Sequence, residues 1–343
     1  MNNRILLLKK MSCLHLRKFF CNKKKKNLSS LRNSPYTRMR GEEMKTGAVS
    51  SQWYAFATVV LWSSAFVFTK VALLSFSSTA LGFLRCAIAS VVLYAVLRCK
   101  GVRMLNWREL PRFTLSGALG FSIYLFIFNK GSETLTAATG CILIATAPII
   151  TALMASVVFR ERLTRLAWIA LWLAFLGVLV LMLWNGSVSI NAGVFWMLGA
   201  ALAISAYNVI QRLYANGYTS LQITAYSFFT ATVMLAGFLP ESIRQIESAP
   251  LSHVIAVIFL GVFPSALAYL LWAKALSFAA TTSDVTKFMF LTPLLSFVLG
   301  YVVISELPGV ETWIGGALIL SGLALFHISG QRAERARRAA MRH

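Results

Sequence analysis

The chain has 343 residues, of which 58% are hydrophobic and only 13% are charged, and its formal net charge is +22. The apolar residues gather into long uncharged runs that are separated by short connectors, a pattern that soluble domains do not show. The composition therefore indicates a multi-pass membrane protein and leaves no room for a soluble catalytic domain.

The first 43 residues form a basic segment, with the run Lys23–Lys26 and no apolar stretch longer than Ile5–Leu8. Because this segment lacks the apolar core of a signal peptide, we expect no cleavable secretion signal. One interpretation is a disordered, solvated arm that contacts anionic lipid. The other is that translation starts at Met44, because the residues Arg40–Glu43 can be encoded by purine-rich codons like those of a bacterial ribosome-binding site. N-terminal peptide sequencing distinguishes the two.

Ten segments are long and apolar enough to cross a hydrocarbon core of roughly 30 Å, which takes about 20 helical residues. The third is the weakest, because it lies between Arg112 and Lys130, and without it the two termini would lie on opposite sides. The sequence predicts an all-α polytopic membrane protein with ten transmembrane helices, at residues 53–73, 79–97, 113–128, 135–158, 166–184, 193–211, 219–239, 252–273, 285–304 and 312–328.

The Lys and Arg residues of the connectors predict the orientation, since they accumulate on the cytoplasmic side. With the N-terminus inside, the outer connectors carry only Lys130 and Arg244. The inner connectors carry Arg98, Lys100, Arg103, Arg108, Arg112, Arg160, Arg162, Arg165, Arg212 and Lys274. Both termini are therefore predicted to be cytoplasmic, in the plasma membrane. Thirteen Lys and Arg before residue 46 and five after Gly330 follow the same rule, so the charge does not indicate nucleic-acid binding.

The chain also repeats itself at an offset of 145 residues. Without a gap, the overlay pairs Tyr124 with Tyr269, Pro148 with Pro293, Glu161 with Glu306, Trp168 with Trp313 and Gly177 with Gly322. Matches of Pro, Glu and Trp are uncommon by chance in an apolar chain. Each copy contains five helices, and this odd number inverts the second copy relative to the first.

Two inverted halves have two near-equivalent arrangements, each open to one side of the membrane, which is the requirement for alternating access. The predicted limits are 1–50 for a basic cytoplasmic arm, 51–187 and 188–330 for the two five-helix repeats, and 331–343 for a basic cytoplasmic tail.

The repeated stretches resemble the EamA-like family of drug/metabolite transporters. They run from Ala147-Pro148 to Glu161-Arg162-Leu163 and from Thr292-Pro293-Leu294 to Ile304-Ser305-Glu306. The first span, with Leu61-Trp62-Ser63-Ser64-Ala65-Phe66 and Lys70, and the second, with Phe83-Leu84-Arg85, are also similar to that family. The resemblance covers residues 50–330 and implies ten helices, a central cavity between the halves, and transport of amino acids, other metabolites or drugs. One departure is Ala170, where the family has a glycine and the second half keeps Gly315; we expect a packing difference there.

The candidates for solute contact lie on helices that should surround this cavity: Trp62, Arg85, Tyr124, Pro148, Asn208, Gln211, Tyr269, Trp272, Lys287 and Pro293. Pro148 and Pro293 each remove a backbone donor in mid-helix, so kinks there either line the cavity or serve packing alone. Asn208 and Gln211 share one helix face, where hydrogen bonding between helices is the alternative to solute contact. For each aromatic residue, an interfacial or packing role is the alternative.

Charged groups inside a span face a cavity or find a partner. Lys70 and Lys130 lie near span ends, so we expect them to extend to the outer interface. Arg85 lies a third of the way into the second span, where it either faces the cavity or acts in gating, or else extends to the interface. Lys287 either pairs with Asp284, three residues before it, or holds a solute carboxylate or phosphate. We expect Glu161 and Glu306, at helix ends, to cap or pair.

The sequence predicts a secondary transporter, an exporter or exchanger of small metabolites such as amino acids or amphipathic compounds, and the direction follows from the resemblance alone. A non-transporting receptor or scaffold is one alternative, and an integral membrane enzyme acting on lipid-linked substrates is another, although no HExxH, paired acidic motif or phosphate-binding loop occurs. The five cysteines are scattered, so no metal or cofactor is expected. The expected partners are a small-molecule solute and membrane lipid, without nucleic acid, and a homodimer is compatible with this.

Overall fold

The computed structural model describes residues 36–102, 107–159, 163–184, 192–214, 217–279 and 285–340. These residues form helices and turns and contain no strand. The chain divides into two units, Met1–Gly47 and Ala48–His343. The described part of the second unit contains ten helices that are long and apolar enough to span a membrane.

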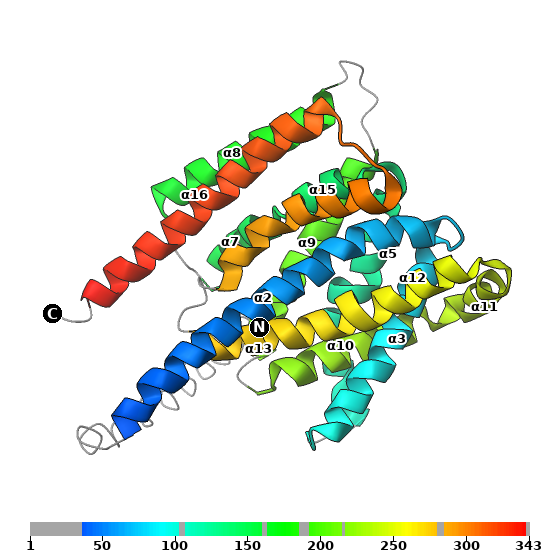
Figure 1. Cartoon of the computed structure of the whole chain (residues 1–343), viewed down its shortest axis with the longest axis horizontal. Coiled ribbons are helices and arrows are strands. Elements are labelled where there is room, and N and C mark those ends of the chain that lie inside the picture. The colour runs from blue at the N-terminus through cyan, green and yellow to red at the C-terminus, as the bar shows by residue number, and fades with distance from the viewer. Residues whose placement is uncertain are drawn as a thin grey trace, which may run out of the picture. The chain divides into compact units, whose positions relative to one another are not determined.

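Five spans are single helices (Figure 1): span 1 is Ser51–Leu73 of α2 (Tyr36–Leu73), span 2 is α3 (Ser78–Cys99), span 5 is α8 (Arg165–Leu183), span 6 is α9 (Ala192–Tyr214), and span 10 is Val310–Ala333 of α16 (Val310–Ala340). The other five are composite. Span 3 (Arg108–Thr134) passes through the 3-10 turn η1 (Trp107–Phe113), α4 (Thr114–Gly117), the π-helical turn η2 (Ala118–Ser122) and α5 (Ile123–Thr134). Span 4 (Ala137–Val158) joins α6 (Ala137–Ile144) to α7 (Ala147–Val158).

Span 7 (Ser220–Ser248) consists of α10 (Ser220–Leu235), the 3-10 turn η3 (Ala236–Phe238) and α11 (Leu239–Ser248). Span 8 (Leu251–Phe278) consists of α12 (Leu251–Val262), the π-helical turn η4 (Phe263–Leu267) and α13 (Ala268–Phe278). Span 9 (Lys287–Ile304) consists of the 3-10 turn η5 (Lys287–Phe290) and α15 (Leu291–Ile304).

The ten predicted spans are confirmed, including the third, but some connectors are helical where loops were expected. Arg108 and Arg112 lie in η1, and Arg244 lies in α11. Span 7 continues to Ser248 because Pro240 occupies the first turn of α11, where a proline starts a helix without losing a hydrogen bond.

The expectation of a disordered arm up to residue 43 is wrong for residues 36–43, because α2 begins at Tyr36. Arg40, Glu42 and Glu43 favour helix, so the helix of span 1 continues backwards through them. Residues 1–35 lie outside the described residues, and the start at Met44 stays a prediction.

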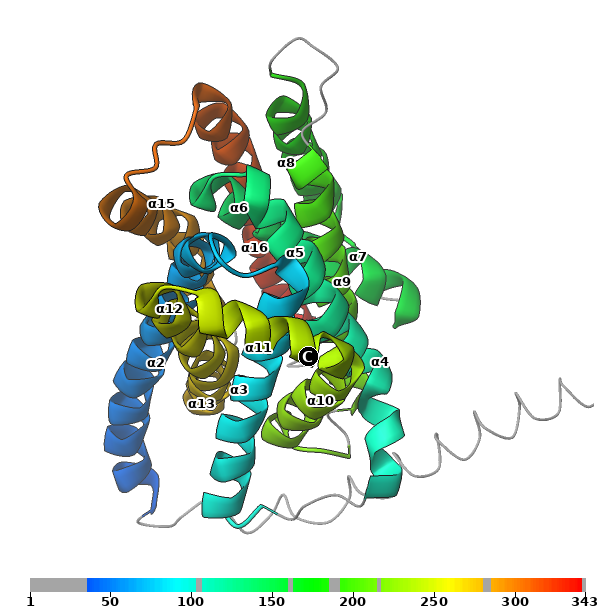
Figure 2. The same ribbon diagram turned by 90° about the vertical axis from the view of Figure 1, so that its right-hand side faces the viewer.

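The packing of the second unit follows a pseudo-two-fold relation between the halves. Helix α9 of span 6 packs against α5 of span 3 and against α6 and α7 of span 4 (Figure 2). The equivalent helix of the first half is span 1, and it contacts the equivalents of those helices: Thr58 Oγ1 donates to Ala268 O of span 8 (3.4 Å), and Ser63 Oγ donates to Thr292 O of span 9 (3.1 Å). Spans 2 and 7 pack on each other, as do spans 5 and 10.

The contact between spans 5 and 10 shows this relation at the atomic level. A β-carbon added at Gly177 would lie 2.6 Å from Gly315 O, and one added at Gly322 would lie 2.7 Å from Ala170 O. Both the two glycines and their two partners are 145 residues apart. The backbones of α8 and α16, which lie side by side (Figure 1), therefore come into contact at two equivalent points. Small residues permit such a close approach of helices in membranes.

Candidate functional site

Arg85 lies at a contact between the two halves. Its side chain projects from α3, and the residue is only 5% exposed. Its Nη1 donates to Thr69 Oγ1 of span 1 (3.3 Å), and its Nε and Nη2 both donate to Ser265 Oγ of span 8 (3.4 Å each). Of the two alternatives for Arg85, extension to the interface does not fit these contacts, and a cavity-facing or gating role stays a prediction.

Aromatic residues from several spans surround this guanidinium. Arg85 Cζ lies 5.9 Å from the centroid of the Phe128 ring, which lies 5.7 Å from the Tyr124 ring. Tyr269 follows by four residues Ser265, the residue of span 8 that accepts from Arg85. The Tyr269 ring packs 5.7 Å from that of Trp62, which packs 5.3 Å from that of Trp272. The structure thus brings five sequence-predicted residues together in what we call the central cluster: Trp62, Arg85, Tyr124, Tyr269 and Trp272.

Two π-helical turns, which the sequence analysis did not predict, shape this cluster. They are η2, Ala118–Ser122, and η4, Phe263–Leu267, and the offset between them is again 145 residues. In span 8 the turn includes Pro264 and places Ser265 against Arg85. In span 3 it places Phe121 5.7 Å from Tyr269, centroid to centroid. Turns of this kind frequently occur at functional sites. Pro264 was the available signal in span 8, but span 3 has no proline at the equivalent position, Leu119.

The two repeated prolines are not mid-helix kinks, which corrects the prediction. Span 4 is interrupted between α6 and α7, and Pro148 lies in the first turn of α7. Pro293 similarly lies near the start of α15, after the 3-10 turn η5. A proline in a first turn loses no intrahelical hydrogen bond. The residues just before them accept bonds from other spans: Ala147 O from Ser205 Oγ (2.9 Å) and Thr292 O from Ser63 Oγ (3.1 Å).

The remaining predicted residues lie apart from the central cluster. Asn208 is exposed, and its Nδ2 donates to Thr151 Oγ1 across spans 6 and 4 (3.5 Å), which fits the interhelical alternative. Gln211, one turn on, is partly buried. Lys287 is exposed, with Nζ 5.6 Å from the Phe288 ring centroid. Its predicted partner Asp284, like Glu161, lies outside the described residues.

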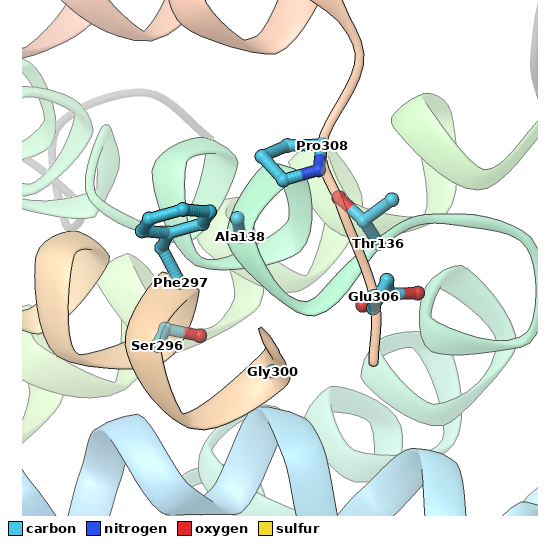
Figure 3. Close-up of a pocket in the computed structure, with 7 residues that line it drawn as sticks. All are labelled: Thr136, Ala138, Ser296, Phe297, Gly300, Glu306 and Pro308. Carbon is cyan, nitrogen blue, oxygen red and sulfur yellow. The ribbon is translucent and has the colours of Figure 1, made fainter. Parts of the chain in front are cut away.

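Lys70 lies near a span end, and it has protein partners there that were not predicted. It forms an ion pair with Glu306 and donates to Leu135 O (2.7 Å), while Glu306 Oε2 accepts from the Ala137 backbone N–H (2.7 Å). Glu306 therefore both pairs and caps, which confirms both expected roles. We call these contacts the Lys70 latch. It joins spans 1 and 4 to the connector after span 9, beside a recess lined by Thr136, Ser296 and Pro308 that is too small for a water molecule (Figure 3).

Two more carboxylates join the start of α3 to the ends of spans 3 and 7, at the same end of the bundle, and neither contact was predicted from the sequence. Ser77 Oγ donates to Glu241 Oε1 (2.6 Å), and Ser78 Oγ donates to Glu133 Oε1 (2.5 Å). The serines at the start of α3 were the available signal, because serine is a preferred N-cap residue. Lys130 pairs with Glu133 at 3.1 Å, where both side chains are more than a third exposed. Among the described residues, no group of His, Cys, Asp and Glu could hold a metal ion.

Comparison with known proteins agrees with this architecture. The EamA-like transporter family matches the chain twice, at residues 50–183 and 191–328. A protein of Streptantibioticus cattleyicolor named "Probable terminal-alkyne amino-acid exporter" is 30% identical over 275 residues, 80% of this chain and 92% of the relative. An S-adenosylmethionine/S-adenosylhomocysteine transporter of Chlamydia trachomatis serovar L2 is 26% identical, covering 79% of this chain and 88% of its own.

A solved crystal structure that is 20% identical has the same fold, with a TM-score of 0.57 and coverage of 83% of this chain and 99% of the other. The family matches both halves of the chain, each half contributes five spans, and the relatives carry the names of transporters. The chain therefore belongs to the EamA-like transporter family and is a multi-pass membrane transporter of small solutes, not an enzyme.

Proposed function

We propose that this transporter exports or exchanges small metabolites, such as amino acids or amphipathic compounds, across the plasma membrane by alternating access. The observation that carries the proposal is the pseudo-two-fold packing, in which equivalent π-helical turns, 145 residues apart, flank the contact between the halves. Inverted halves of this kind can exchange their two conformations and so open toward either side. We further propose 51–187 and 188–330 as the limits of the repeats.

The solute class is proposed from the relatives and from the central cluster. One relative is named for an amino acid and another for S-adenosylmethionine and S-adenosylhomocysteine. Both names denote compounds that combine an ionised α-amino acid group with a less polar body. The central cluster offers a guanidinium and large aromatic surfaces, the two kinds of group that such a molecule needs.

The orientation follows from the positive charges: the Lys70 latch would lie at the outer end of the bundle and the Arg-rich connectors at the inner end. In this arrangement the carboxylates Glu133, Glu241 and Glu306 hold the outer connectors together. We propose that the structure represents the state closed to the outside.

Transport is tested by comparing metabolites inside and outside cells that express the chain with those in cells that lack it. We expect at least one small amphipathic or amino-acid solute to be depleted inside and enriched outside. The purified chain in proteoliposomes should then move that solute down its gradient. If no solute responds across a broad panel, while the protein is demonstrably folded in the membrane, the proposal fails.

The proposed topology predicts that both termini are cytoplasmic. A reporter that is active only in the cytoplasm should be active when fused before Met1 and also when fused after His343. Ten spans, an even number, require both termini to lie on the same side, and the positive charges predict that this side is the cytoplasm. Termini on different faces of the membrane would contradict the inverted pair of repeats.

A further inference from the structure

The charge of Arg85 has no protein counter-ion in the described part of the chain. Arg85 is the only charged residue among the described residues that are classed as buried. A guanidinium carries five N–H donors, and only three hydrogen bonds are formed, all to neutral hydroxyls at 3.3 to 3.4 Å. These distances lie beyond the usual range for an N–H donor. A cation inside a membrane span ordinarily pairs with an anion or with backbone carbonyls, or faces a water-filled cavity.

The repeat indicates that Arg85 is not part of the common scaffold. The residues that shape both halves recur at the offset of 145: the pairs Pro148 and Pro293, and Gly177 and Gly322. The position equivalent to Arg85 is Thr230, whose hydroxyl lies 3.1 Å from Phe113 O, a backbone carbonyl. The second half therefore packs without a charge at this position, so the repeated fold does not itself require the charge of Arg85.

We propose that Arg85 binds the carboxylate of the transported solute, so that the central cluster selects small monocarboxylates with an apolar body, amino acids included. Arginine binds carboxylates through two parallel hydrogen bonds, and the guanidinium lies between Thr69 of span 1 and Ser265 of span 8. A single buried positive charge matches a monoanion rather than a phosphate monoester, which carries nearly two charges at neutral pH. In this assignment the apolar body would contact the rings of Trp62, Tyr124 and Tyr269, which belong to the same cluster. This assignment rests on the proposed function and names its solute class.

The test measures binding apart from transport. The purified full chain in detergent is heated with L-phenylalanine, with L-phenylalaninamide and with phenethylamine, and with the corresponding leucine series. The amide and the amine keep the apolar body but lack the carboxylate. Binding to the folded state raises the unfolding temperature, and at one ligand concentration the rise grows with the logarithm of the affinity. We expect at least one of the two amino acids to stabilise the protein, and its amide and amine to do so with at least tenfold weaker affinity.

The variant Arg85→Gln should lose the amino-acid-dependent shift, and Arg85→Lys should retain part of it, since it keeps the charge but not the planar fork. Arg98→Gln is the matched control, because Arg98 is an exposed residue on the same helix, and the shift should be unchanged. If Arg85→Gln does not fold, the loss of part of the shift in Arg85→Lys tests the assignment on its own.

Three outcomes would overturn the assignment: no amino acid in the panel stabilises the wild type, the amides stabilise it equally well, or the shift survives in both Arg85 variants. If transport of other solutes is then observed, the proposed function stands without this site. If the amino acids bind through Arg85 but no compound crosses proteoliposomes, the site stands and the proposed function fails.

Discussion

Replacing Gly322 with leucine is expected to abolish the accumulation of folded protein. A β-carbon at this position would lie 2.7 Å from Ala170 O, 2.9 Å from Ala174 N and 3.1 Å from Ala174 Cβ. Backbone atoms cannot move away as a flexible side chain can, so α16 would have to separate from α8. We expect a cost of about 3 kcal/mol or more, at the upper end of overpacking effects. The measurement is the yield of monodisperse protein after detergent extraction, together with its unfolding temperature.

The matched control is Gly330→Leu, on the same helix, where an added β-carbon meets no atom within 4 Å. The pseudo-two-fold relation adds a second requirement, because Gly177 approaches Gly315 O as Gly322 approaches Ala170 O. Gly177→Leu should therefore be as damaging as Gly322→Leu. A well-folded Gly322→Leu protein, or a large difference between the two variants, would contradict the proposed symmetric crossing.

The spans could be predicted from the sequence because they depend on the length of apolar runs, which is a local property. The repeat could be predicted because Pro148, Glu161 and Gly177 recur without a gap. Ala170 replaces the glycine of the family at a position where a small residue was expected. It is fully buried, and its backbone oxygen lies against Gly322. Each of these features can be inferred from the type of a residue and its position along the chain, without knowing which helix packs against it.

The partners of polar residues could not be predicted, because they depend on how helices dock. The spacing of Lys70 from the span end fits extension to the interface, but Glu306, far along the chain, lies within reach instead. The π-helical turn at Ala118–Ser122 contains no proline that would have indicated it in the sequence. Pro148 was interpreted as a kink because the run 135–158 reads as one continuous helix, and the interruption at Ala145 and Thr146 has no glycine or proline signal of its own. Tertiary packing decides such details.

Removing the Lys70 latch is expected to open the end of the bundle at which it lies. Lys70→Ala would leave the Glu306 carboxylate without its ion-pair partner and Leu135 O without its donor. Charge-assisted hydrogen bonds of this kind, with side chains 23% and 18% exposed, should contribute about 1 to 2 kcal/mol. The population of the opened form should therefore rise roughly 5- to 30-fold.

Cys141 provides the reporter for this opening. It is buried, 2% exposed, and lies in α6 about one turn beyond Ala137, the residue that Glu306 caps. In a background with Cys13, Cys21 and Cys99 replaced by serine and the buried Cys86 by alanine, Cys141 is the one remaining thiol. A water-soluble thiol reagent should label it 5- to 30-fold faster in Lys70→Ala, because labelling of a buried thiol follows the equilibrium of local opening.

The Lys130–Glu133 ion pair is the natural control, since it lies at the same end but joins neighbouring turns of one helix and is more than a third exposed. Lys130→Ala should change labelling by less than about twofold, as expected for an exposed pair. Exchanging the two charges, Lys70→Glu with Glu306→Lys, should not restore protection: the new Glu would face Leu135 O, and the new Lys would face the Ala137 N–H. Full recovery by the exchange would mean that the ion pair alone closes this end and that the two backbone contacts contribute nothing. Unchanged labelling in Lys70→Ala would remove the latch from the proposed transport cycle altogether.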